Sequence, residues 1–89
     1  MLYIVTYFPQ RQTRNIALLR QVQTFDKYAM LNETTFLVGA SIAASTIRDR
    51  LKPHLRVNDQ LFVAKLDKTA AWTGFDSSFS QWMRSAVEA

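Results

Sequence analysis

The chain has 89 residues, which is enough for one domain over residues 1–89 and too few for a second. Hydrophobic residues make up 48% of it, with only two glycines and two prolines, so the composition excludes a disordered chain. With no cysteine and one histidine, it excludes a disulfide framework and a thiolate or histidine-rich metal site, while the net charge of +4 favours anionic partners.

The first expected element is a strand over residues 2–8. Its β-branched, aromatic and aliphatic residues continue without interruption to Pro9, which is the pattern of a strand buried on both faces. Over residues 12–24 the apolar positions recur at helical spacing, so we predict a helix there. Thr13 is its expected N-cap, because the hydroxyl can accept a hydrogen bond from an amide of the first turn.

Two short strands are expected next, over residues 26–31 and 34–38. A tight turn at residues 32–33 joins them, which predicts a hairpin. A second helix is expected over residues 42–53, with apolar side chains inward and charged side chains outward. Pro53 ends this helix, because proline cannot donate the next helical hydrogen bond.

A fourth strand is expected over residues 60–66, after a turn. From residue 78 the apolar and aromatic side chains recur at helical spacing, which predicts a short amphipathic helix. The order β-α-β-β-α-β is that of the ferredoxin-like split βαβ fold. We therefore predict an α+β domain with a four-stranded antiparallel sheet, two helices on one face, and a C-terminal aromatic tail over residues 72–89.

Three segments in the later part of the chain carry a family resemblance. They are Thr35–Val38, Ile47–Leu55 and Asn58–Val63, and the aromatic segment Ala71–Phe75 with Trp82 extends the likeness. In these segments the chain resembles small bacterial and phage proteins described as SinR-like or CRISPR-associated-like. These are related in fold to the dimeric small subunit of the CRISPR spacer-acquisition complex. The resemblance implies a ferredoxin-like protomer, a sheet-to-sheet homodimer, and either binding of double-stranded nucleic acid or metal-dependent nuclease activity.

The nuclease chemistry of the related proteins depends on an aspartate at the end of the first strand, usually after a tyrosine. Here Tyr7 is followed by Phe8, whose side chain cannot bind a divalent cation. We therefore expect no catalytic residue, no metal ligand and no cofactor. A divergent metal-dependent nuclease or toxin is kept as an alternative.

Basic residues around the two predicted helices are the candidate phosphate contacts. The predicted nucleic-acid site consists of Arg11, Arg14, Arg48, Arg50, Lys52 and Arg56. Arg11 and Arg14 stand near a helix start, where a positive charge opposes the helix dipole, so helix stability does not explain them. The competing explanation for the second helix is a solvated face, on which Asp49 lies between arginines for solubility.

The dimer interface is expected on the sheet face that the helices leave open. The first and fourth strands are apolar on both faces, so a second protomer, the aromatic tail or both must cover that face. The predicted interface consists of Tyr3, Tyr7, Trp72, Phe75, Phe79 and Trp82.

No apolar stretch approaches the ~20 residues needed to cross a bilayer, so a cytoplasmic protein with no membrane partner is expected. The sequence thus favours a homodimer that binds duplex DNA or RNA through a basic surface without cleaving it. The alternative is a protein-interaction module of phage or mobile-element origin that docks on a host protein complex.

Overall fold

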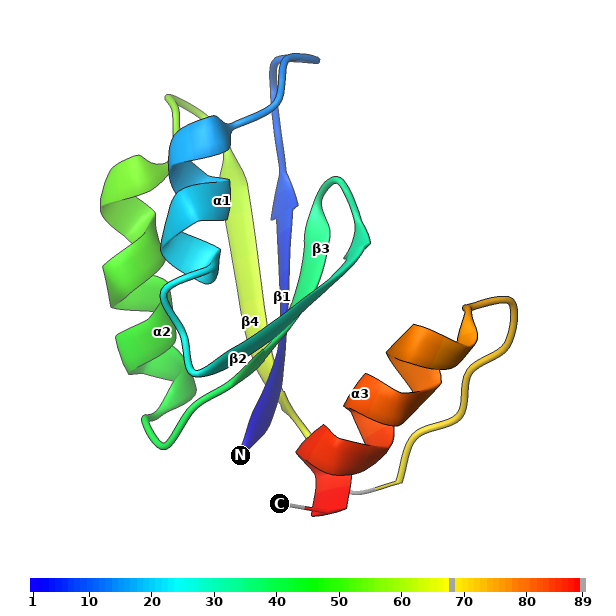
Figure 1. The fold of residues 1–89 in the computed structure, drawn as a ribbon. Coiled ribbons are helices and arrows are strands. Elements are labelled where there is room, and N and C mark those ends of the chain that lie inside the picture. The colour runs from blue at the N-terminus through cyan, green and yellow to red at the C-terminus, as the bar shows by residue number, and fades with distance from the viewer. Residues whose placement is uncertain (68, 89) are drawn as a thin grey trace.

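Two helices cover one face of a four-stranded sheet, and a third helix lies against the other face (Figure 1). The structure is a computed structural model and describes residues 1–67 and 69–88. In chain order the elements are β1 (Leu2–Phe8), α1 (Ile16–Val22), β2 (Lys27–Asn32), β3 (Thr35–Gly39), α2 (Ala44–Leu51), the 3-10 turn η1 (Lys52–His54), β4 (Gln60–Leu66) and α3 (Ser77–Glu88).

The strand order is β2-β3-β1-β4, and every neighbouring pair is antiparallel. Consecutive strands β1 and β2 are therefore separated by β3, as in a split βαβ arrangement. At the centre of the sheet, Val5 of β1 lies opposite Phe36 of β3 and Val63 of β4. The predicted α+β, ferredoxin-like fold is confirmed.

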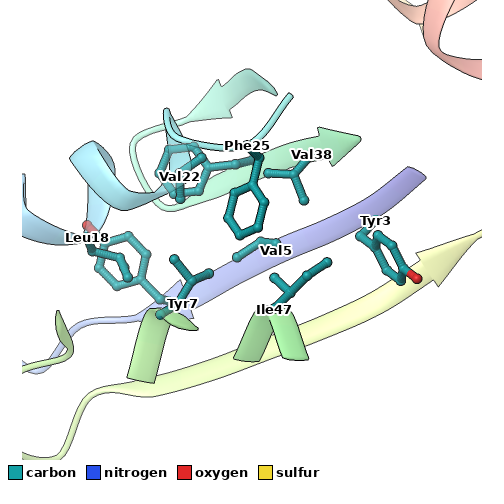
Figure 2. Close-up of a cluster of buried hydrophobic side chains, with 10 residues drawn as sticks. Tyr3, Val5, Tyr7, Leu18, Val22, Phe25, Val38 and Ile47 are labelled. Carbon is teal, nitrogen blue, oxygen red and sulfur yellow. The ribbon is translucent and has the colours of Figure 1, made fainter. Parts of the chain in front are cut away.

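The main core lies between the sheet and the helices α1 and α2. Alternate residues of β1 point into it, and Figure 2 shows their side chains packed among those of the two helices. The fully buried members include Val5, Leu18, Val22, Ile47 and Leu51. Because side chains alternate along a strand, the intervening residues of β1 must face the opposite side.

A second, smaller core lies between that opposite side and α3. Leu2 of β1, Leu37 of β3 and Met83 of α3 are its buried members. The predicted amphipathic C-terminal helix is confirmed, and it begins at Ser77. The last residue of the predicted tail, Ala89, lies outside the described residues. None of the helices in residues 1–67 and 69–88 is long and apolar enough to span a bilayer.

The first helix begins later than predicted, and Thr13 is not its cap. The N-cap is Asn15, whose Oδ1 accepts a hydrogen bond from the amide of Leu18 at 3.0 Å. The hydroxyl and carbonyl oxygens of Thr13 instead accept hydrogen bonds from Arg56, at 2.9 and 2.6 Å. Thr13 therefore lies outside the helix, bonded to a residue far away in the chain, and α1 begins at Ile16.

The second helix and the hairpin turn also differ slightly from the prediction. The carbonyl of Ile42 accepts a hydrogen bond from the hydroxyl of Tyr3 at 2.6 Å, and α2 begins only at Ala44. Asn32 is the last residue of β2, and its Oδ1 accepts a hydrogen bond from the amide of Thr34 at 2.9 Å. The turn is thus centred one residue later than expected.

Replacing Asn15 should destabilise the fold, because this buried side chain makes two hydrogen bonds. Besides capping α1, its Nδ2 donates to the carbonyl of His54 at 2.9 Å. We expect Asn15→Ala to lower the free energy of unfolding by about 2 kcal/mol, since a cap and a buried hydrogen bond contribute about 1 kcal/mol each. Asn15→Ser keeps a capping oxygen without placing an acceptor against the His54 carbonyl, so it should lose less stability. Urea denaturation measures both, and equal stability of Asn15→Ala and the parent would contradict the assignment.

Candidate functional site

The outer surface of the helix layer is rich in positive charge. On α1, α2 and η1 together, the only acidic residue is Asp49. The same three elements carry four exposed cationic side chains. We call these the helix-layer basic surface: Arg20, Arg48, Arg50 and Lys52. Three of the four were predicted as phosphate contacts, and Arg20 was not, although its place opposite the apolar positions of α1 marks it as exposed.

The cationic side chains of this surface make few interactions within the protein. Arg48 pairs with Asp49 through Nη2 and Oδ1 at 3.0 Å, but both side chains are more than half exposed, so the pair contributes little to stability. The guanidinium of Arg50 lies over the ring of Phe25, 5.6 Å from its centroid, and this contact fixes its direction. Lys52 makes no ion pair within the described part of the chain. All three therefore keep hydrogen-bond donors for an anion.

Arg56, predicted as a phosphate contact, belongs to a structural network instead. Its Nη1 and Nη2 atoms donate to Thr13, and its Nε atom lies 3.8 Å from Oδ2 of Asp59. The side chain of Asp59 is fully buried, and that of Arg56 is 26% exposed. Because both terminal nitrogens bond to Thr13 and the side chain is mostly buried beside Asp59, we assign Arg56 a structural role.

Asp59 connects two loops at the same end of the sheet. Its Oδ1 accepts a hydrogen bond from the amide of Gln10 at 2.9 Å, and its Oδ2 accepts one from the amide of Arg56 at 3.3 Å. Asn58, just before it, has a φ of 68°, a left-handed conformation that asparagine tolerates better than most residues. The loop after β1 is thereby attached to the loop before β4.

Arg11 and Arg14 lie on this attached loop, beyond the end of β1. Arg14 is 4.0 Å from Glu33 in the β2–β3 turn, and both side chains are more than half exposed. Arg11 is exposed and makes no ion pair with the residues that the structure describes. The two predicted contacts therefore lie at one end of the sheet, on the loop that leads into α1.

The aromatic tail folds back on its own sheet. Trp72, Phe79 and Trp82 pack against the smaller core, and Nε1 of Trp72 donates to Oγ of Ser80 at 3.0 Å. Phe75 stacks on Phe79 with ring centroids 4.4 Å apart and stays 44% exposed. The chain itself therefore covers part of the face on which a second protomer was expected.

Tyr3 and Tyr7 are not available to a second protomer, contrary to the prediction. Their side chains are 2% and 4% exposed and lie under the helices in the main core (Figure 2). The sequence showed that β1 is apolar on both faces but not which alternate set lies under the helices. On the face opposite the helices, β1 carries Leu2, Ile4, Thr6 and Phe8.

The end of this face where β1 finishes is uncovered. We call it the open end of the sheet. Phe8 and Phe62 of β4 are 52% and 57% exposed there, and neither makes a ring contact with another aromatic side chain among residues 1–67 and 69–88. Phe62 lies opposite Thr6, so both rings are on the same face. The alternation of β4 could have identified Phe62, but the prediction left it out.

The described residues offer little to a metal ion. Within residues 1–67 and 69–88, no three His, Cys, Asp or Glu side chains are grouped so that they could hold one. Phe8 occupies the end of β1, and its side chain offers no oxygen or nitrogen ligand.

Comparison of the chain with protein-family models, with curated proteins and with solved structures finds no match. The residues and their geometry therefore carry the functional argument.

Replacing Arg56 separates its structural role from phosphate binding. We expect Arg56→Gln to lower the free energy of unfolding by about 2 kcal/mol, because it removes the partner of a buried carboxylate that is only partly screened by solvent. Arg11→Gln, on the same attached loop, should leave stability unchanged within about 0.5 kcal/mol. Thermal and urea denaturation measure both, and an Arg56→Gln protein as stable as the parent would contradict the structural assignment.

Proposed function

We propose that this protein binds duplex DNA or RNA through phosphate contacts made by the helix-layer basic surface. The observation that carries the proposal is the charge of that surface, where four exposed cations accompany a single carboxylate, Asp49. Neutralising phosphates releases condensed counterions, which is the main source of affinity in binding that is independent of sequence.

The chemistry of this surface suits a duplex. The exposed residues of α1 and α2 include no aromatic ring, so the surface lacks the rings on which unpaired bases usually stack. In a duplex the bases are already stacked and paired, and the phosphates are what a cationic surface meets. Binding of this kind positions a protein on the helix without reading its sequence.

Pairing of two chains stays a prediction. Because α3 and the aromatic segment cover one end of the sheet, the need for a second protomer is smaller than the sequence indicated. Docking on a host protein complex stays the alternative function. Both differ from the proposed function in their salt dependence, since docking of proteins releases far fewer counterions than phosphate contacts do.

Replacing two cations of the helix-layer basic surface should weaken duplex binding. In Arg48→Gln/Lys52→Gln the side chains stay polar, lose their charge, and two phosphate contacts are lost. Arg50 is left intact because it packs on Phe25. We expect the slope of log K against log salt to fall by about 2 units, since each contact contributes about 0.9. Fluorescence anisotropy with a labelled duplex over a range of salt concentrations measures this slope.

The matched control is Lys27→Gln/Arg84→Gln, which removes the same charge from β2 and α3 on the other side of the sheet. It should leave the slope within about 0.5 units of the parent value. An equal decrease of the salt slope in the two variants would show that binding depends only on the net charge of the protein. No duplex binding by the parent protein at low salt would refute the proposal.

We also expect the bound duplex to remain uncut. The side chain of Phe8 at the end of β1 offers no oxygen for a divalent cation, and such a cation would be needed to activate a water molecule. Incubation of the protein and a labelled duplex with Mg²⁺ or Mn²⁺, followed by a denaturing gel, checks this. Products that form with the metal and not with EDTA would instead identify a metal-dependent nuclease.

A further inference from the structure

We propose that the open end of the sheet is a second binding site, which takes unpaired bases of a single-stranded nucleic acid on the rings of Phe8 and Phe62. This goes beyond the proposed function, because the two rings lie on the opposite face of the sheet from the helix-layer basic surface. The ligand is also different, since a duplex does not present the faces of its bases.

The two rings are placed as neighbours on adjacent strands. Thr6 lies opposite Phe62, and Phe8 lies opposite Gln60, so the rings occupy diagonal positions of one antiparallel pair. Diagonal positions are about 7–8 Å apart, close enough for two successive bases of one strand to contact the two rings. Both rings are more than half exposed and are not stacked on another aromatic ring of the described residues, so each has a face to offer.

The groups around the rings fit a nucleobase. The hydroxyl oxygens of Thr6 and Thr35 are 3.0 Å apart on this face, and the amide of Gln60 is beside them, so donors and acceptors for base edges lie next to the rings. On this face of β1, β3 and β4 no residue carries a charge, and the exposed carboxylate of Glu33 in the β2–β3 turn lies 4.0 Å from Arg14.

Positive charge lies beside the rings rather than among them. Arg11 follows Phe8 by three positions and makes no ion pair with any described residue, and Arg14 is on the same loop. Asp59 and Arg56 hold that loop through Gln10 and Thr13. A phosphate contact from Arg11 is therefore made from a loop whose backbone is already attached, which lowers the entropy lost on binding.

The exposed area decides between a nucleic acid strand and a second copy of the chain. A fully buried aromatic side chain covers about 150–250 Å², so two half-exposed rings offer about 200 Å². A stable dimer buries about 800 Å² on each partner, roughly four times as much. Two bases stacked on two rings need no more surface than this end of the sheet provides.

The test uses a fluorescein-labelled oligothymidylate of about 12 nucleotides, which has no duplex structure and lies within the usual site sizes of single-strand binders. In Phe8→Leu/Phe62→Leu both sites stay apolar and lose their rings. We expect the affinity in fluorescence anisotropy to fall about tenfold for each ring, in the lower half of the range for base stacking. Arg11→Gln should reduce the salt slope by about 0.7 units, the contribution of one phosphate contact on a single strand.

Two variants serve as controls. Phe62→Tyr keeps the ring and should bind oligothymidylate as the parent does, and Phe75→Leu removes an exposed ring from the tail and should also change nothing. The variant Arg48→Gln/Lys52→Gln should weaken duplex binding and leave oligothymidylate binding unaltered. The two proposals therefore fail independently.

Three results would overturn the inference. One is a parent protein that does not bind oligothymidylate at low salt, and another is a double leucine variant that binds it as tightly as the parent. The third comes from light scattering of the two proteins. A parent at twice the 10.3 kDa chain mass, with a double leucine variant at the single mass, would show that a second copy occupies the open end.

Discussion

The central strand β1 imposes the main constraint on this structure, because it is apolar on both faces. A strand of this kind must be covered on both sides, and a domain with only two helices between its strands covers one. Here α1 and α2 bury Tyr3, Val5 and Tyr7, and α3 buries Leu2 from the other side (Figure 1). The C-terminal helix is therefore a structural third layer and not an appendage of the fold.

The reach of α3 decides where the surface remains apolar. Its contacts gather around Leu2 and Leu37, at the end of the sheet where β1 begins. Phe8 and Phe62, at the other end, are left exposed because the described part of the tail packs around Leu2 and Leu37 instead. The exposed rings are thus a consequence of how a short helix covers a longer sheet. Monomers tolerate an apolar patch of this size, so it requires no partner for stability.

Exposed cations and exposed rings gather in different parts of the surface. The helices α1 and α2 carry exposed cations and no exposed ring, whereas the strand residues at the open end of the sheet carry two exposed rings and no charge. These chemistries suit different parts of a nucleic acid, the phosphates in one case and the base faces in the other. Arg56 shows that charge alone is a poor guide, because the buried carboxylate of Asp59 holds it in place.

The sequence by itself determined the element order, the exact bounds of β1 and β4, and the presence of a C-terminal helix, because hydrophobic periodicity and proline act locally. Tertiary structure decided what depends on distant residues. Thr13, the expected cap of α1, bonds to Arg56 instead, and the side of β1 that lies under the helices made Tyr3 a core residue. Strand alternation is the same whichever face the helices choose, so only packing distinguishes a buried ring from an exposed one.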